Sequence, residues 1–359
     1  MNRNKYLILA LILLLIPICV FAMQKNKKRR NLTNRGIRNL RKFNFKEGLE
    51  TLNLGRNKIS DLSQLEVPST LKELYLADNP ISDLSNLNLN QGLEVLFLAG
   101  NEISDVSNLK LPESLISLNL LDNQLESIEN LQFNSNLERL VLRRNNIQNF
   151  SNVIFPESLR NLEIGNSDLI NTENYQFNQG LESLLITGTD LTSIEQMTFP
   201  DSINQLIIIS SNLQTMTGDN LPDTLEELDF GNNFFNQFEG VRFPSELKKL
   251  NLSFNNIDGN NFIDLILPEG LEELNLSRNI LFNPEEELPA FPFPDSLENL
   301  TLPDSIKVLD LSDNSLNHLD NLDVPASLEI LKVKKNFFSR KEKRKIKKRF
   351  KQLGVKVRI

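Results

Sequence analysis

The chain has very few of the residues on which metal sites and most active sites depend. Its 359 residues include one cysteine, one histidine and no tryptophan. Because Cys19 lies in an apolar stretch near the amino terminus, the rest of the chain can form no internal disulfide and offers no thiol nucleophile. With His318 as the only histidine, zinc sites made of several cysteines and histidines are excluded, and a Ser-His-Asp triad could be built only around that residue.

Phosphate-binding and acid–base motifs are also missing. The chain has no glycine-rich phosphate loop and no Gly-x-Gly-x-x-Gly motif. Carboxylates are abundant, but adjacent pairs such as Glu226 and Glu227 recur with the repeat described below, so they do not indicate a catalytic pair. We expect a protein that is not an enzyme, with no catalytic residue, no cofactor, no metal ion and no small-molecule substrate.

Acidic residues are almost absent from both ends of the chain. Residues 1–42 hold eleven basic residues and no acidic one, and residues 339–359 hold eleven basic residues and one acidic one. The segment between them therefore keeps 17 basic against 46 acidic residues, although the net charge of the whole chain is only −8. The sequence thus predicts an acidic body with two basic ends, each a candidate for contact with an anionic surface.

One long run without charge lies near the amino terminus. Residues 6–23 are uncharged and largely apolar, follow Arg3 and Lys5, and end beside the small residue Ala22. This arrangement is typical of a secretory signal cleaved after Ala22. The alternative is an uncleaved anchor, because 18 helical residues reach about 27 Å and the cations that follow favour a cytoplasmic flank. Residues 1–22 therefore predict a signal peptide or an anchor, and a secreted or membrane-anchored protein.

A leucine pattern with a 22-residue period fills most of the chain. Its core reads Leu-x-x-Leu-x-Leu-x-x-Asn, and ten units 22 residues apart are followed by one after a step of 24 and two more after a step of 35. The thirteen units begin at Leu49, Leu71, Leu93, Leu115, Leu137, Leu159, Leu181, Ile203, Leu225, Leu247, Leu271, Ile306 and Leu328. Ten of them carry the asparagine of the motif, at Asn57, Asn79, Asn101, Asn123, Asn145, Asn233, Asn255, Asn279, Asn314 and Asn336.

The spacing of the leucines predicts a solenoid of stacked strands. The last leucines of the motif alternate with other residues, so they point to one side of a strand and the residues between them to the other. Twenty-two residues leave too little chain for a long return helix, so we expect a short return with inward residues such as Ile59, Leu62 and Leu65. A single unit cannot bury its leucines, whereas stacked units share one core and pair their strands in parallel at about 4.8 Å.

Two further patterns qualify the repeat. The residue three before each unit's first leucine alternates between Pro and Asn from Pro68 to Pro200, which predicts a 44-residue doublet with two turn chemistries. The motif's asparagine, which can satisfy backbone groups where the chain leaves the strand, is replaced by Ser167, Thr189 and Ser211 in three consecutive units. We interpret these replacements as tolerated drift, with a weak point built into the array as the alternative.

The array is irregular at two places. The 35-residue step before Ile306 contains an unplaced Leu-x-x-Leu-x-Leu segment at 297–302, which we interpret as part of a surface excursion, either a binding loop or a decayed repeat. Lys27 stands where a unit before the first one would need its leucine. Residues 23–48 are therefore predicted to form a basic linker and a degenerate N-terminal cap.

The repeat resembles the leucine-rich repeat family over residues 49–338. The period and the segment 57–65 are similar to the internalin and phosphatase-regulator subclass, while the segments 221–225 and 230–237 resemble FNIP repeats of amoebae and giant viruses. The resemblance implies an α/β leucine-rich repeat solenoid with a curved parallel β-sheet on its concave face, short convex returns and a C-terminal helix cap. It also implies a non-enzymatic protein-binding scaffold. In bacterial effectors with similar repeats, enzymatic activity lies in an added domain, which the 21 residues after Phe338 are too few to form.

The segment 339–359 predicts a basic cap made of a helix and a last strand. Ser339 can cap a helix that runs to about Leu353, with Ile346, Phe350 and Leu353 on one inward face. The cations of the helix either form a solvated outer face or bind an anionic surface such as membrane headgroups. They are Lys341, Arg344, Lys345, Lys347, Lys348, Arg349 and Lys351. Because aromatic residues for base stacking are nearly absent, we expect no specific binding of nucleic acid.

The outward positions of the predicted strands define a candidate binding face. These positions in the early and middle units, with one adjacent arginine, are occupied by Tyr75, Val95, Phe97, Leu121, Arg139, Val141, Arg143, Arg144, Leu185, Ile207 and Ile209. Apolar and aromatic residues repeated over neighbouring strands usually mark a partner, so we predict that another protein binds this concave face. The alternatives are that β-propensity alone selects these residues, or that two copies pack face to face. The rival function is a membrane- or surface-structural spacer whose basic ends bind anionic surfaces.

Overall fold

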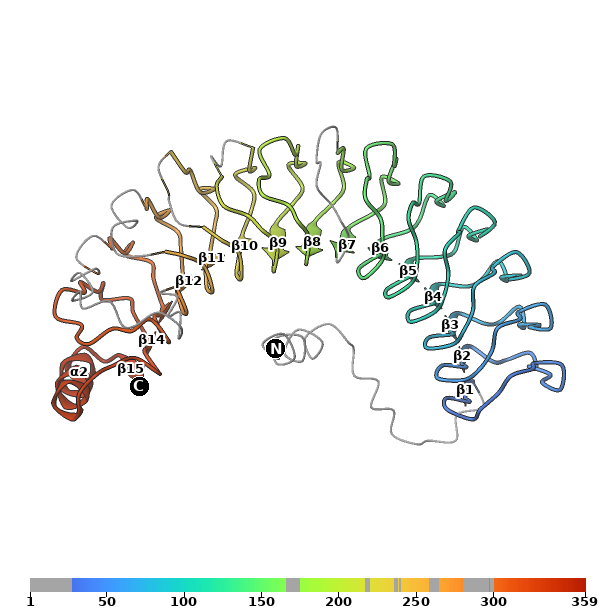
Figure 1. The fold of residues 1–359 in the computed structure, drawn as a ribbon, viewed down its shortest axis with the longest axis horizontal. Coiled ribbons are helices and arrows are strands. Elements are labelled where there is room, and N and C mark those ends of the chain that lie inside the picture. The colour runs from blue at the N-terminus through green and yellow to red at the C-terminus, as the bar shows by residue number, and fades with distance from the viewer. Residues whose placement is uncertain are drawn as a thin grey trace.

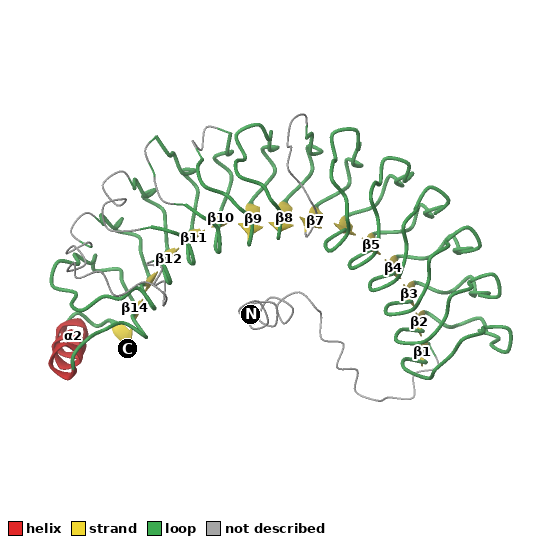
Figure 2. Cartoon of the chain, in the orientation of Figure 1, coloured by secondary structure: helices red, strands yellow, loops and turns green. Residues whose placement is uncertain are grey.

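The repeats form a horseshoe. The computed structural model describes residues 28–165, 175–216, 220–235, 238, 240–257, 265–279, 297 and 300–359. Short strands run along the inner, concave side of the arc and irregular returns form its outer, convex side (Figure 1). Loops and turns make up most of the chain, and the one helix of the described residues lies at the carboxyl-terminal end of the arc (Figure 2). The predicted leucine-rich repeat architecture, with its C-terminal helix, is therefore confirmed.

The described residues contain fifteen strands that pair in chain order in one sheet. The elements are β1 (Arg29–Asn31), β2 (Thr51–Asn53), β3 (Glu73–Tyr75), β4 (Val95–Phe97), β5 (Ser117–Asn119), β6 (Arg139–Val141), β7 (Asn161–Gly165), β8 (Ser183–Thr187), β9 (Gln205–Ile209), β10 (Glu227–Asp229), β11 (Lys249–Asn251), β12 (Glu273–Asn275), β13 (Val308–Asp310), β14 (Ile330–Lys332), α2 (Arg340–Gln352) and β15 (Lys356–Arg358). Neighbouring strands are parallel, and Leu74 pairs with Leu96 as residues at the same repeat position. Because side chains alternate along a strand, this register stacks each core leucine on that of the next turn.

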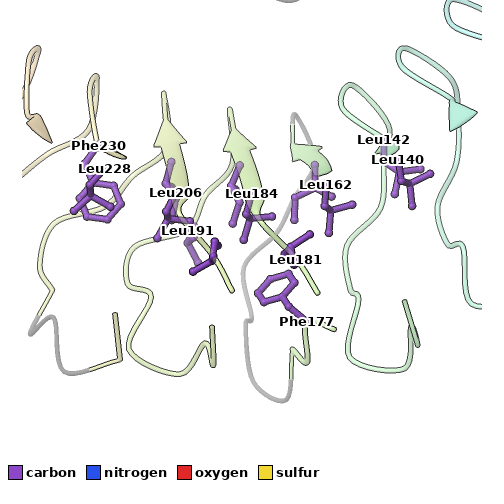
Figure 3. Packing of buried hydrophobic residues seen from close by; sticks show 14 of the residues in the cluster. Leu140, Leu142, Leu162, Phe177, Leu181, Leu184, Leu191, Leu206, Leu228 and Phe230 are labelled. Atoms are coloured by element: carbon purple, nitrogen blue, oxygen red, sulfur yellow. The ribbon is translucent and has the colours of Figure 1, made fainter. Parts of the chain in front are cut away.

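The stacked leucines make one continuous core along the arc. Figure 3 shows Leu162, Leu184 and Leu206 of neighbouring strands pointing to the same side, with Phe177 and Leu191 supplied by the returns. All five side chains are buried. A fully buried leucine contributes about 1.5–3 kcal/mol, and here much of that burial comes from the adjacent turns, so each turn is stabilised mainly by its two neighbours.

Nine of the ten corner asparagines are buried, and they form bridges to the preceding turn. The Asn79 side-chain amide donates to the carbonyl of Leu76 in its own turn at 2.9 Å and to that of Leu54 in the preceding turn at 3.2 Å. Its Oδ1 atom accepts from the Ile59 N–H at 3.1 Å. The same bonding recurs at other corners, including Asn57, Asn101, Asn123 and Asn145. The amide thus satisfies backbone groups where the chain leaves the strand, as its position in the sequence predicts.

The alternation of Pro and Asn has a structural counterpart just before each strand. The Asn134 amide donates to the Pro112 and Leu115 carbonyls of the preceding turn at 2.7 and 2.8 Å. In the proline-type turn, a hydroxyl makes the corresponding link. Ser114 Oγ, for example, donates to the Leu93 carbonyl at 2.6 Å. Two different side-chain links therefore alternate along the arc, with the 44-residue period seen in the sequence.

The first turn is more complete than the sequence suggests. Strand β1 pairs with β2 in the register of the later turns, and Leu40 and Phe45 are buried, so residues 28–48 form a turn with a strand of its own. Arg30 takes the position of a core leucine, and its guanidinium lies 5.7 and 5.2 Å from the ring centroids of Phe43 and Phe45. The sequence did not predict strand β1, because Arg30 stands where the repeat has a leucine and covers the aromatic edge of the core.

The 35-residue step adds no strand to the sheet in the described part of the chain, since β12 pairs directly with β13. Leu297 and Leu300 of the unplaced leucine segment are buried, and the Leu300 N–H donates to the Leu297 carbonyl at 3.2 Å. Leu65 makes the same bond to Leu62 at 2.9 Å in a regular convex return. The segment therefore supplies the convex return before β13 rather than a decayed strand. Residues 280–296 of the excursion lie outside the described residues.

A helix and a strand close the carboxyl-terminal end of the core. Helix α2 begins after Ser339, whose Oγ accepts from the Glu342 N–H at 3.1 Å, and it buries Ile346 and Phe350. Strand β15 then pairs with β14 and completes the sheet. Leu353, which the periodicity places on the inward face, is 54% exposed because the helix ends one residue earlier and Leu353 occupies its C-cap position.

Candidate partner-binding face

The structure places the predicted partner-binding residues along the concave side of the arc. The predicted residues, from Tyr75 to Ile209, lie in strands β3–β9 or two residues after their ends, and they alternate with the core leucines. Figure 1 shows these strands on the concave side. Arg144 is the exception, since it lies in the corner after β6 with a positive φ of 59° and is exposed on the rim. The face therefore consists of the outward side chains of consecutive strands. Its chemical character changes along the arc with the residues at these positions.

Apolar side chains are accessible mainly on the first strands of this face. Tyr75 and Phe97 lie side by side with ring centroids 5.9 Å apart, and both are half-buried, as are Val95 and Leu121. Small residues, including Ala77, accompany them at the strand ends. Strands β3–β5 thus present a contiguous apolar and aromatic surface, which we call the aromatic patch (Tyr75, Ala77, Val95, Phe97 and Leu121).

Three of the predicted apolar residues are not available at the surface. Val141, Leu185 and Ile209 are only 2%, 5% and 6% exposed, although they lie on the concave side of their strands. A sheet that curves toward its own side chains brings those of neighbouring strands together, so these residues pack within the face. Ile207, on the same part of the sheet, is half-buried.

The two concave arginines of β6 and its corner are held by one carboxylate. Glu163 of β7 is only 7% exposed and forms ion pairs with both arginines. One carboxylate oxygen accepts a hydrogen bond from Arg139 Nη2 at 2.6 Å, and the other lies 2.9 Å from Arg143 Nε. Arg144 pairs instead with Asp122 at 3.3 Å. Glu163 was not predicted as a site residue, although adding the 22-residue period to Val141 places it between the two arginines. The arginine cluster, which we define as Arg139, Arg143 and Glu163, keeps one net positive charge beside the aromatic patch.

Carboxylates are the most frequent charged residues at the concave positions of strands β10–β13, where Glu227, Asp229, Glu273 and Asp310 stand against one lysine, Lys249. Asp229 Oδ1 accepts from the Gly231 N–H and from the Asn251 amide, both at 2.8 Å. Burial raises the pKa of the Asp229 carboxyl, in spite of these two hydrogen bonds. Asp310 forms an ion pair with Lys332 at 3.4 Å. The concave face therefore changes along the arc from apolar and aromatic, through cationic, to acidic and polar on β10–β13, and it ends with Lys332, Lys356 and Arg358 on β14 and β15.

Two family models match the sequence of the repeats. The model described as Leucine Rich repeats (2 copies) matches residues 47–89 and 69–111, and the model described as Leucine Rich repeat matches residues 245–260. The chain is a leucine-rich repeat protein. The narrower subclass expected from the 22-residue period stays a prediction. The search of curated protein sequences found no match to this leucine-rich repeat protein.

Solved structures with the same fold come from several bacteria. YopM from Yersinia enterocolitica is 25% identical with a TM-score of 0.58, and the match covers 82% of this chain and 57% of YopM. A leucine-rich repeat protein from Leptospira interrogans is 23% identical with a TM-score of 0.53, covering 92% of this chain and 95% of that one. YopM from Yersinia pestis is also 23% identical, with a TM-score of 0.53 and coverages of 79% and 71%. The leucine-rich repeat protein thus spans little more than half of the first of these relatives.

The cations predicted to bind an anionic surface fall into two groups on α2. Lys345 forms an ion pair with Asp320, and Arg349 donates to the Leu319 and Leu322 carbonyls at 2.6 and 2.7 Å. These two side chains hold the helix on the last convex return of the leucine-rich repeat solenoid. The other five are exposed to solvent: Lys341, Arg344, Lys347, Lys348 and Lys351. Arg340 and Lys343, which were not among the predicted residues, are exposed beside them.

The amino-terminal segment predicted to be a signal or an anchor lies outside the described residues. Within the described ranges, no helix has the length and apolar character that would let it cross a membrane. In the same ranges, no group of three or more His, Cys, Asp or Glu side chains could hold a metal ion. Localisation of the leucine-rich repeat protein therefore stays a prediction from residues 6–23.

Proposed function

We propose that the leucine-rich repeat protein is a non-enzymatic scaffold that binds another protein through its concave face. The observation that carries this proposal is the aromatic patch, in which Tyr75 and Phe97 remain partly accessible at 5.9 Å from each other. Contiguous accessible apolar surface in a folded protein commonly marks a binding site, and tyrosine and arginine are enriched among the residues that contribute most binding energy.

The neighbouring arginine cluster supports the same site. Glu163 fixes the Arg139 and Arg143 side chains in place, so a partner loses little side-chain entropy when it contacts them. A partner that suits this face has an apolar segment over β3–β5 and a carboxylate, or another acceptor, near β6. The acidic concave positions of β10–β13 favour a complementary basic segment further along the partner.

We also propose that the protein is exported or tethered to a membrane. The support is the uncharged segment 6–23, with the cations that follow it. Amino-terminal sequencing of the protein from its native source distinguishes the two possibilities. A mature chain that begins at Met23 indicates export with cleavage after Ala22, whereas an intact Met1 in the membrane fraction indicates an anchor.

The concave-face proposal is tested with a partner captured on the immobilised full-length protein. We expect Tyr75→Ala combined with Phe97→Ala to weaken binding by at least about 1 kcal/mol, which is about fivefold. Arg143→Gln, which leaves the Arg139–Glu163 pair intact, should have an effect of similar size. The matched control is Ile154→Ala with Phe337→Ala, which removes exposed apolar side chains from outside the concave patch and should leave affinity unchanged.

Two outcomes would contradict the proposal. If both concave variants bind with the affinity of the wild type and only changes in the 280–305 excursion weaken binding, the site is that excursion. If binding depends solely on the cations of the two chain ends, the repeats act as a spacer, which is the rival function. Thermal unfolding of each variant shows whether an observed loss of binding comes from loss of the fold.

A further inference from the structure

Helix α2 has an inward side that performs the capping and an outward side that does not contribute to it. At about 100° per residue, Ile346, Phe350, Lys345 and Arg349 fall on one side of the helix. Ile346 and Phe350 are buried in the core, and Lys345 and Arg349 bind the last convex return. The outward side spans an arc of roughly 160° and consists only of cations. We call it the cationic face: Arg340, Lys341, Lys343, Arg344, Lys347, Lys348 and Lys351.

The cationic face is not explained by the stability of the helix. Its seven side chains are exposed, and none forms an ion pair with another described residue. Four pairs of them are four residues apart, among them Arg340 with Arg344 and Lys347 with Lys351. Like charges at this spacing repel each other and destabilise a helix. A cap that needed only to be soluble could alternate both signs, as the exposed faces of most helices do.

We propose that the cationic face docks on the anionic headgroups of a lipid bilayer. The face lies on a straight helix of 13 residues, about 20 Å long, at the outer end of the arc (Figure 1). It can therefore meet a flat surface while the concave face stays open to a protein partner. With no apolar side chain on the arc, the contact is electrostatic and peripheral, without insertion into hydrocarbon. Each cation near such a surface raises the affinity about fivefold.

The remainder of the chain favours a membrane over other polyanions. Stable attachment to a bilayer generally requires two signals, of which one is apolar and the other can be a polybasic patch. Residues 6–23 are the only long apolar run of the sequence, and five cations follow at 25–30. For a nucleic acid, the cationic face lacks the aromatic and amide side chains that stack on bases or read their edges.

A second copy of the chain is a poorer match, even though its body is acidic. Carboxylates at the start of the strands already pair with cations of a neighbouring turn. Glu50 pairs with Lys28 at 2.7 Å, and Glu226 pairs with Lys248 at 2.9 Å. Glu272 pairs likewise with Lys307 at 2.8 Å. The acidic body thus presents charges that are dispersed and partly neutralised, whereas a lipid surface presents them continuously.

The test measures binding of the full-length protein to vesicles of phosphatidylcholine with and without about 30% phosphatidylserine, at low and high salt. The face variant carries Gln in place of Lys341, Arg344, Lys347, Lys348 and Lys351. Its matched control carries Gln in place of five exposed cations of the first turn: Arg35, Arg38, Arg41, Lys42 and Lys46. The two variants lose the same charge at opposite ends of the arc. Because both retain residues 6–23, binding to neutral vesicles supplies a common baseline.

We expect wild-type protein to prefer anionic vesicles, with a preference that falls as salt rises. The face variant should lose at least about tenfold of the affinity for anionic vesicles, and the control variant less than about threefold. The midpoint of thermal unfolding should be the same for wild type and face variant, because nothing in the described chain packs on the cationic face. Capture of the concave-face partner should also be unchanged, which separates this proposal from the proposed function.

Three results would overturn the docking proposal. Equal losses in both variants would show that net charge, rather than the face of α2, controls the interaction. Tighter binding of the wild type to an RNA or DNA duplex than to anionic vesicles at the same salt would assign the face to nucleic acid. A dimer in sedimentation that disappears in the face variant, without a change in vesicle binding, would assign it to a second copy.

Discussion

Turns with an asparagine corner and turns with a hydroxyl corner end their strands differently. From β2 to β6, where the corners are asparagines, each strand has three residues. At the corners Thr189 and Ser211, strands β8 and β9 run for five residues, and Thr187 pairs with both Gly165 and Ile209. Asparagine amides bind the carbonyl just beyond the three-residue strand, as Asn57 and Asn79 do at Leu54, while N–H groups further on, such as that of Arg56, still donate to the next turn. Without such an amide, the backbone continues to pair with the next strand. The corner residue therefore determines where a strand ends rather than whether it forms.

The hydroxyl corners keep some side-chain bonding of their own. Thr189 Oγ1 and Ser211 Oγ lie 2.9 Å apart in a buried hydrogen bond. The Ser211 N–H donates to Asn233 Oδ1 of the following turn at 3.2 Å. In these turns, two additional residue pairs between neighbouring strands and one hydrogen bond between hydroxyls thus take the place of the hydrogen bonds of the asparagine side chain. This arrangement supports the interpretation of these corners as tolerated drift, and three substitutions test it.

The largest expected effect belongs to an asparagine corner, Asn145→Ala. The buried Asn145 amide donates to the Leu120 and Leu142 carbonyls at 2.9 and 2.8 Å, and its Oδ1 accepts from the Leu125 N–H at 3.0 Å. Within the described residues, the substitution leaves the Leu142 carbonyl and the Leu125 N–H without a side-chain partner, and the Leu120 carbonyl keeps only the Asn123 amide. We therefore expect the free energy of unfolding to fall by about 4 kcal/mol. Urea denaturation measures this loss.

Asn146→Ala is the matched control for that substitution. Asn146 is the next residue along the chain, is exposed, and makes no side-chain hydrogen bond to another described residue. We expect a change of less than about 0.5 kcal/mol. If the two variants unfold at the same urea concentration, the amide ladder does not stabilise the turns, and the difference between the two kinds of corner has no energetic meaning.

The features that repeat from turn to turn could be predicted from the sequence, whereas the differences between individual turns could not. The repeated motif is sufficient to place the core leucines of strands β2–β14, because a repeated register leaves one way to stack parallel strands. The length of β7–β9 could not be read from the pattern, since it depends on which backbone groups a missing amide leaves free. Strand β1 was missed because Arg30 covers the core edge by a cation–π contact rather than as an apolar side chain.

The candidate site shows the same division between periodic and local information. Period and alternation place Tyr75 and Phe97 on the concave side, where the structure has them as neighbours. The burial of Val141 could not be predicted from period and alternation, because burial on a curved face depends on the size of the side chains in adjacent strands. Ion pairing between turns could have been predicted by adding the period, as the position of Glu163 shows. The inward roles of Lys345 and Arg349 required the actual placement of α2.

A smaller loss is expected from Gly165→Ala, which disrupts the additional pairing of the long strands. Gly165 has a φ of 137°, and a Cβ atom there would collide with the backbone of Thr187 in β8. We expect a loss of about 3 kcal/mol in the free energy of unfolding, from backbone strain and from separation of the strands.

Gly48→Ala separates the two causes of that loss. Gly48 also has a positive φ, of 88°, but a Cβ atom there meets nothing within 4 Å. The free energy of unfolding of the Gly48→Ala variant should therefore fall by only about 1 kcal/mol, from the strain of the left-handed conformation. Equal losses at the two glycines would mean that close pairing at the end of β7 contributes nothing to stability.

The smallest effect is expected at a hydroxyl corner, with Ser211→Ala. The substitution removes the hydrogen bond to Thr189 but leaves the Ser211 N–H on Asn233 Oδ1 and keeps the pairing of Thr187 with Ile209. Alanine also fits the small buried space of serine, so no clash adds to the loss. We expect the free energy of unfolding to fall by about 1 kcal/mol, which is the usual contribution of one buried hydrogen bond. Measured in the same urea series as Asn145→Ala, the difference between the two variants is then about 3 kcal/mol. Should Ser211→Ala cost as much as Asn145→Ala, the longer strands would not compensate for the missing amide, and the hydroxyl corners would be the weak point of the array.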